Sequence, residues 1–118
     1  MNYIEIPARD IESTKKFYTQ VFNFNWIDYG LKYSAHQLGE ITFAVNAEAV
    51  AAEIHKPQDQ NCIGPFVLFK TNNITLSLEK VRSSGGEILS DIYPYPGGSR
   101  FHFIDPGKNV IGVYQSDE

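Results

Sequence analysis

The chain carries one strand-and-helix pattern twice, and this internal duplication is the feature that most limits its possible folds. The first copy begins with an apolar strand pattern at residues 3–7, and the second begins 63 positions later at residues 66–70. The same offset pairs Ile4 with Val67, Ile6 with Phe69, Asp10 with Asn73, Ile11 with Ile74, Tyr18 with Val81, Asn23 with Gly86 and Trp26 with Leu89. A duplicated unit of this kind favours a pseudo-twofold arrangement with a cavity where two sheets meet.

Two amphipathic helices are predicted, over residues 11–22 and 74–83, one in each copy. Their buried faces at helical spacing are Thr14, Phe17, Tyr18 and Val21, and Ile74, Ser77, Leu78 and Val81. Asp10 and Asn73 precede the helices as N-caps. Asn23 follows the first helix, where a residue that tolerates left-handed backbone is favoured.

The remaining patterns predict strands at 25–29, 32–38 and 41–46, and at 87–92, 100–104 and 110–115. Residues 47–56 resemble a short helix, and residues 57–65 an irregular connection. Residues 93–98 predict a loop whose glycines permit a turn, or form a mobile lid. We therefore expect one α+β domain over 1–118, with half-modules of about 1–56 and 63–118 and a linker of about 57–62.

Composition narrows the functional classes. Cys62 is the only cysteine, so an intramolecular disulfide is excluded, and the absence of a signal-peptide pattern predicts a cytoplasmic location. The net charge is −4 and no cluster of Lys or Arg occurs, which argues against nucleic acid or a membrane surface as the partner. A small molecule is the expected partner.

Four segments, in this order, resemble the vicinal oxygen chelate superfamily of glyoxalase I, bleomycin-resistance proteins and extradiol dioxygenases. They are IEIPARD (4–10), FYTQVFN (17–23, with Trp26), GGEIL (85–89) and FIDPGKNVIGV (103–113). The resemblance implies two tandem βαβββ modules that form a cup-shaped pair of four-stranded sheets. The sequence departs from the family at Asn23, where Gly is usual, and at Gly107-Lys108, where an acid and then Gly are usual.

In metal-dependent members of this superfamily, the resemblance implies a His or Gln ligand on the first strand of each module and a Glu on the last. The matching positions here hold Tyr3, Phe66 and Gly112, with the fourth near Ala44. None suits a divalent metal, which prefers imidazole, carboxylate or thiolate, and a Tyr phenol stays protonated up to about pH 10. The sequence therefore predicts no metal and no cofactor, because function depends on the site rather than on the fold.

Strand alternation places a set of aromatic and polar side chains in the cup. The ligand-binding candidates are Tyr3, Glu5, Phe66, Leu68, Arg100, His102 and Tyr114. Such a lining is typical of a small-molecule site, although the aromatic rings could instead fill the cup as core. Glu5 would orient a ligand or act as a base, or else form a structural ion pair with Lys70 or Arg100. Arg100 suits a carboxylate or phosphate on the ligand.

Two histidines leave an alternative open. His36 and His102, if both faced the cup, could form a metal site at new positions, although no carboxylate lies beside them. His55 lies near the linker, where solvent exposure is expected.

Three functions follow, and no catalytic residue is assigned for any of them. The leading hypothesis is metal-free binding of a small apolar or aromatic ligand, as in the bleomycin-resistance branch, by a homodimer that shares its cup. The second is a metal-dependent lyase (lactoylglutathione lyase-like), isomerase or dioxygenase with displaced ligands. The third is a partner-binding module whose cup is filled by side chains.

Overall fold

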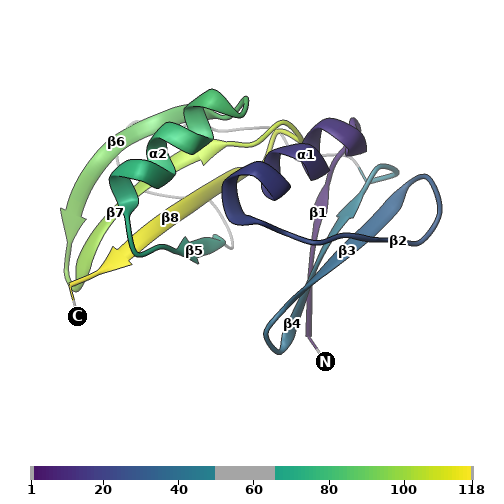
Figure 1. Cartoon of the computed structure of the whole chain (residues 1–118), viewed down its shortest axis with the longest axis horizontal. Coiled ribbons are helices and arrows are strands. Elements are labelled where there is room, and N and C mark those ends of the chain that lie inside the picture. Colours follow the sequence, from purple (N-terminus) through teal and green to yellow (C-terminus); the bar gives the residue numbers. More distant parts are fainter. Residues whose placement is uncertain (1, 50–65, 118) are drawn as a thin grey trace.

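The structure, a computed structural model, describes residues 2–49 and 66–117 and contains the same run of elements twice. The first module is β1 (Asn2–Pro7), α1 (Ile11–Phe22), β2 (Ile27–Asp28), β3 (Tyr33–Leu38) and β4 (Ile41–Asn46). The second is β5 (Leu68–Lys70), α2 (Ile74–Ser83), β6 (Glu87–Tyr95), β7 (Gly98–Ile104) and β8 (Val110–Ser116). The predicted α+β fold with βαβββ order is confirmed (Figure 1).

Each module forms one four-stranded mixed sheet with the same topology. Sheet A has the strand order β1-β4-β3-β2, and sheet B has the order β5-β8-β7-β6. The first and last strands of each module pair in parallel, and the other pairs are antiparallel. Glu5 lies beside Ala44 in sheet A, as Leu68 lies beside Gly112 in sheet B.

Both helices begin and end where their sequences predict. The side chain of Asp10 accepts from the backbone N–H of Ser13 at 3.2 Å, and that of Asn73 accepts from Leu76 at 3.1 Å. These N-caps satisfy backbone donors that the helix cannot pair internally. Asn23 caps the C-terminus of α1 with a left-handed φ of 59°.

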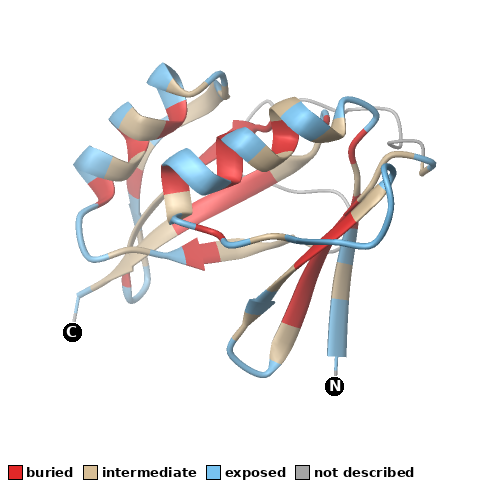
Figure 2. Cartoon of the chain, turned by 45° about the vertical axis from the view of Figure 1, so that its right-hand side comes forward, coloured by how far each residue is buried: buried red, intermediate tan, exposed pale blue. Residues whose placement is uncertain are grey.

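The two modules share a single hydrophobic core. Helix α1 packs against α2 and β4, and its aromatic rings reach both sheets. Figure 2 shows buried residues, in red, in the helices and in the strands beneath them. Phe17 lies 5.5 Å from Phe103 of β7, and Tyr18 lies 5.4 Å from Phe43 of β4 and 6.1 Å from Phe69 of β5, measured between ring centroids. Sheet A and sheet B therefore turn one face each toward the same packed interior.

The opposite faces of the two sheets point away from this core, because successive side chains of a strand alternate between faces. We call them the outer face of sheet A and the outer face of sheet B. Figure 1 shows the sheets diverging beneath the two helices. A single chain thus carries its two outer faces on different sides of the molecule.

Several boundaries differ from the sequence-based expectation. Residues 93–98 are not a loop: β6 continues to Tyr95 and β7 begins at Gly98, so that only Pro96 and Gly97 form the turn. Gly97 has a φ of 106°, which suits the second central residue of a turn after proline. Pro94 is tolerated because β6 is an edge strand.

The predictions for residues 47–56 and for the linker can be compared with the structure only in part. Residues 47–49 form a turn and a bend rather than the start of the helix predicted for 47–56, and the rest of that segment lies outside the described residues, as do the linker, His55 and Cys62. In the described residues, neither helix is long and apolar enough to cross a membrane.

Candidate functional site

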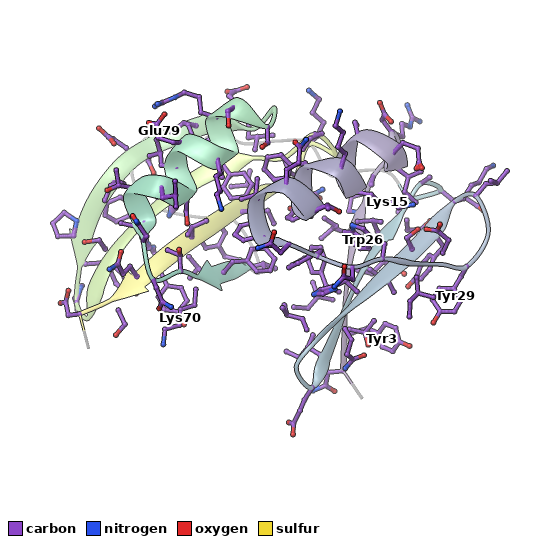
Figure 3. The ribbon with its side chains drawn as sticks, in the orientation of Figure 1. Tyr3, Lys15, Trp26, Tyr29, Lys70 and Glu79 are labelled. Carbon is purple, nitrogen blue, oxygen red and sulfur yellow. The ribbon has the colours of Figure 1, made fainter. Side chains whose placement is uncertain are left out.

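The outer face of sheet A carries a hollow of about 410 Å³. Tyr3, on β1, lies on this face, and Figure 3 shows Tyr3 and Tyr29 on the side of the sheet away from α1. A second hollow of about 520 Å³ adjoins the first at Tyr29 and Tyr33. The first is lined by Tyr3, Ile27, Tyr29, Tyr33, Ala35, Gln37 and Thr42. Both volumes lie in the range of small-molecule sites, and tyrosine dominates the lining.

Apolar side chains on this side of the molecule are unusually exposed. Tyr3 is 63% exposed, Ile27 60%, Tyr29 63% and Leu31 93%. They come from β1, from β2 and from the loop that follows β2. A contiguous apolar surface of this kind marks an interaction or ligand-binding site.

Glu5 shares the outer face of sheet A but does not form the ion pair that was considered for it. Its Oε2 accepts from Nδ2 of Asn46 at 3.3 Å, and no ion pair with Lys70 or Arg100 is found in the described part of the chain. Burial, and then a hydrogen bond to the Glu5 carboxylate, raises the pKa of Tyr33 to about 12. Glu5 is therefore a hydrogen-bonded, exposed acid at the edge of the tyrosine-lined hollow.

On the outer face of sheet B, side chains fill the position where metal-dependent relatives would place an acid. A Cβ atom on Gly112 would lie 2.5 Å from Cδ2 of Leu68 and 2.8 Å from Cζ of Phe66. With any larger residue at this position, these two side chains would have to move. The ring of Phe66 also contacts the imidazole of His102 in a T-shaped arrangement, with 4.7 Å between ring centroids.

Arg100 lies in a setting of aromatic rings on this face. Its guanidinium carbon is 5.9 Å from the ring centroid of Phe66, 5.6 Å from that of Tyr93 and 5.2 Å from that of Tyr95. Its Nε donates a hydrogen bond to the Tyr93 hydroxyl. Tyr114 lies beside Arg100 on the neighbouring strand, between it and Lys70.

His102 is fully buried on the same face. Its Nε2 lies 2.9 Å from the Tyr93 hydroxyl, and its backbone N–H donates to Oγ of Ser90 at 3.0 Å. Burial, and then the positive charge of Arg100, lowers the pKa of His102 to about 4. Its ring is therefore neutral at pH 7.

His36 does not accompany His102 on an outer face. Its ring stacks on Phe24 with 4.1 Å between centroids, on the core side of sheet A, and Nδ1 accepts from the backbone N–H of Asn25 at 3.0 Å. The alternative metal site formed by His36 and His102 is therefore wrong for a single chain, since the two rings belong to different sheets and different faces.

The metal that the fold family implies does not fit the residues at its expected positions. Tyr3, Ala44, Phe66 and Gly112 offer no imidazole or carboxylate, and Phe66 and Leu68 occupy the space over Gly112. Elsewhere in residues 2–49 and 66–117, no group of three His, Cys, Asp or Glu side chains is placed to hold a metal ion.

The family assignment rests on the sequence. The family model described as Glyoxalase/Bleomycin resistance protein/Dioxygenase superfamily matches residues 1–113, so the chain belongs to this superfamily. The resemblance noted from the four sequence segments is thereby confirmed. No curated protein matches the sequence.

Solved structures with low sequence identity show the same fold. A glyoxalase-related enzyme from Fulvimarina pelagi has a TM-score of 0.76 at 17% identity, over 98% of this chain and 87% of that one. A glyoxalase/bleomycin resistance protein/dioxygenase family enzyme from Burkholderia phytofirmans PsJN has a TM-score of 0.76 at 18% identity, over 98% and 97% of the two chains. A mutant of the fosfomycin resistance protein FosX from Listeria monocytogenes, complexed with Mn(II) and 1S,2S-dihydroxypropylphosphonic acid, has a TM-score of 0.75 at 16% identity, over 97% and 87%.

Sequence reasoning missed several residues that the structure brings to these faces. The sequence predicts a loop at Tyr93 and Tyr95, whereas both belong to β6, whose register against β7 shifts twice between Ile88 and Tyr93. Ile27, Tyr29 and Tyr33 were not considered as candidates. Their apolar and aromatic side chains were the only sequence signal for a binding surface. Such side chains occur both on the outer face of a sheet and in the core, so this signal does not tell the two apart.

Proposed function

We propose that this protein binds a small apolar or aromatic ligand without a metal, in a cup built from two chains. The observation that carries this proposal is the packing of Phe66 and Leu68 over Gly112, which replaces a metal-binding position by an apolar surface. Aromatic rings gather on both outer faces, which provides the stacking and burial that such a ligand needs.

A second chain is needed to close the cup, because the two outer faces of one chain point in different directions. The candidate residues of sheet A and those of sheet B lie on different sides of one shared core, so neither face is closed by the other within a chain. A twofold dimer would place sheet A of each chain against sheet B of its partner and form two equivalent cups. The candidates Tyr3 and Glu5 would then meet the partner's set of Phe66, Leu68, Arg100, His102 and Tyr114.

Charge complementarity supports this pairing. The outer face of sheet A carries the acid Glu5, and the outer face of sheet B carries the cation Lys70. The exposed apolar side chains around Tyr3 and Tyr29 would be covered in the dimer. The expected cytoplasmic location remains a prediction.

Native mass spectrometry of protein purified without chelator tests this function, with the neutral probe 2-naphthalenemethanol added in a titration. We expect a dimer that takes up the probe in its two cups and carries no stoichiometric metal. Stoichiometric Ni, Zn, Mn or Fe would contradict the proposal and favour a metal-dependent lyase, isomerase or dioxygenase. A monomer that takes up no probe would favour a module with a filled cup.

A further inference from the structure

His102 has a buried ring nitrogen without a hydrogen-bond partner. The residue is 0% exposed, and its Nδ1 is the one buried side-chain nitrogen or oxygen in the described part of the chain that lacks a partner. A buried polar atom left unpaired is costly, and such atoms are rare in folded proteins. The unpaired Nδ1 of His102 therefore needs a specific structural or functional reason.

A chain of hydrogen bonds determines which nitrogen of His102 carries the proton. Arg100 can only donate, so the Tyr93 oxygen accepts from its Nε. The Tyr93 hydroxyl then keeps its own hydrogen for Nε2 of His102, 2.9 Å away. Nε2 is the acceptor in this arrangement, and the remaining proton of the neutral ring lies on Nδ1. The opposite tautomer would leave the Tyr93 hydrogen without a partner among the described residues.

The unpaired atom is thus a buried N–H donor on a ring that contacts the rings of Phe66 and Tyr93. A pKa of about 4 keeps the ring neutral, so that this donor carries no full charge at pH 7. The Phe66 ring lies against the imidazole at 4.7 Å between centroids, and Phe66 itself is only partly buried. A ligand would reach the imidazole by displacing Phe66.

Arg100 supplies a charge beside this donor. Within residues 2–49 and 66–117, no carboxylate forms an ion pair with its guanidinium, and only its Nε is used on Tyr93. The terminal nitrogens of the guanidinium remain available in the fork geometry that matches a carboxylate. Two rings that such a ligand would leave in place, those of Tyr93 and Tyr95, lie near the guanidinium and provide surfaces on which a flat ligand can stack.

We propose that the outer face of sheet B binds a planar aromatic carboxylate, with Arg100 pairing with the carboxylate and the Nδ1–H of His102 donating to an oxygen of the ligand. The inference rests on the proposed function and names the chemical class of its ligand. Tyr93 is a positioning residue here, because it acts through the tautomer of His102.

The tautomer is tested without any ligand. Long-range ¹H–¹⁵N correlation spectra of labelled protein at pH 7 should show His102 protonated at Nδ1 and unprotonated at Nε2. In Tyr93→Phe, which keeps the ring and removes the hydroxyl, the Nε2-protonated form should appear. An Nε2-protonated or doubly protonated His102 in the unsubstituted protein would overturn the proposal.

Ligand chemistry is tested by calorimetric titration of the full chain with 2-naphthoate and with neutral 2-naphthalenemethanol. We expect 2-naphthoate to bind at least tenfold more tightly, and Arg100→Gln to remove that advantage while binding of the neutral probe stays. Arg82→Gln, on the exposed side of α2, is the matched control and should bind both probes unchanged. Tyr93→Phe should weaken 2-naphthoate binding several-fold, and its melting temperature shows whether it is folded.

The outcomes separate the two proposals. Equal affinity for the two probes would overturn the carboxylate site and leave the proposed ligand-binding function standing. Failure of both probes to bind would contradict both proposals. Binding of 2-naphthoate that survives Arg100→Gln unchanged would also overturn the site.

Discussion

The hydroxyl of Tyr18 donates a 2.6 Å hydrogen bond to Oδ2 of Asp105, and both residues are almost completely buried. Tyr18 belongs to α1 in the first module, and Asp105 begins the turn between β7 and β8 in the second. The same carboxylate accepts from the backbone and side chain of Asn109, whose side chain also donates to the carbonyl of Pro7 at 2.9 Å. A polar network thus joins the two modules beside their shared core.

Removal of the Tyr18 hydroxyl should weaken this junction. Tyr18→Phe keeps the aromatic contacts but takes one donor from a buried carboxyl group, whose pKa burial already raises. We expect the free energy of unfolding to fall by about 1–3 kcal/mol, the cost of unpairing a buried polar group. Urea denaturation measures the loss. Tyr29→Phe, at an exposed ring, should leave stability unchanged, and an equal loss in both variants would contradict the role assigned to Tyr18.

In the turn that follows Asp105, the backbone strain is concentrated at Lys108. This residue has a φ of 71°, a left-handed conformation that costs a side-chain-bearing residue about 1–2 kcal/mol. Lys108→Gly should raise the free energy of unfolding by about 0.5–1 kcal/mol after the entropy cost of glycine is subtracted. The neighbouring Gly107→Ala should do the opposite, since a Cβ there would lie 2.7 Å from the Pro7 carbonyl oxygen. Thermal unfolding of the two variants checks the signs, and stabilisation by both would refute the argument.

Acid should destabilise the protein through His102. Its folded pKa of about 4 lies below the ordinary value of 6.5, so the folded state binds this proton less readily than the unfolded state does. The contribution is fully present above pH 6.5 and is lost as the pH falls toward 4. At ~1.4 kcal/mol per pH unit, the loss over this range is bounded at about 3.5 kcal/mol. Denaturation midpoints from pH 7 to pH 4 should fall less steeply in His102→Gln, whereas parallel curves would show that another group is responsible.

Assembly should depend on the outer face of sheet A. Ile27→Asp adds a charge to the exposed apolar surface that the proposed dimer covers, and it should shift the protein to monomers. Leu76→Asp, at a 50% exposed position on α2, is the matched control because it lies outside both outer faces. Sedimentation equilibrium distinguishes the species. Persistence of the dimer in Ile27→Asp, or its loss in Leu76→Asp, would place the interface elsewhere.

Local sequence signals predicted most of the secondary structure. The bounds of both helices agree with the prediction, because Asp10 and Asn73 cap them and apolar residues recur at helical spacing. The β6–β7 hairpin was missed, since two prolines and two glycines at 94, 96, 97 and 98 indicate a loop, and since the register of β6 against β7 shifts twice before Tyr93. Proline is compatible with that strand only because the strand lies at the edge of sheet B, and the sequence of one strand does not contain its place in a sheet.

For the candidate site residues too, local patterns in the sequence predicted some features, and others depended on contacts between strands. Alternation correctly separated Phe101 and Phe103, which are buried in the core, from Arg100 and His102 on the other face. It left open whether His36 faced the cup, because alternation within one strand does not say which of its faces meets the core; the ring in fact stacks on Phe24 of the core. The pairing of His102 with Tyr93 depends on a cross-strand contact, and no pattern within β7 predicts it.

The order of residues along the chain was by itself enough to define two βαβββ modules and their helix caps, because each of these depends on residues that are near neighbours in the sequence. The tertiary structure alone decided that α1 packs between the two sheets and so turns their outer faces apart. That arrangement depends on rings such as Tyr18 and Phe69, which are far apart in sequence and meet only when apolar surface from both modules is buried together.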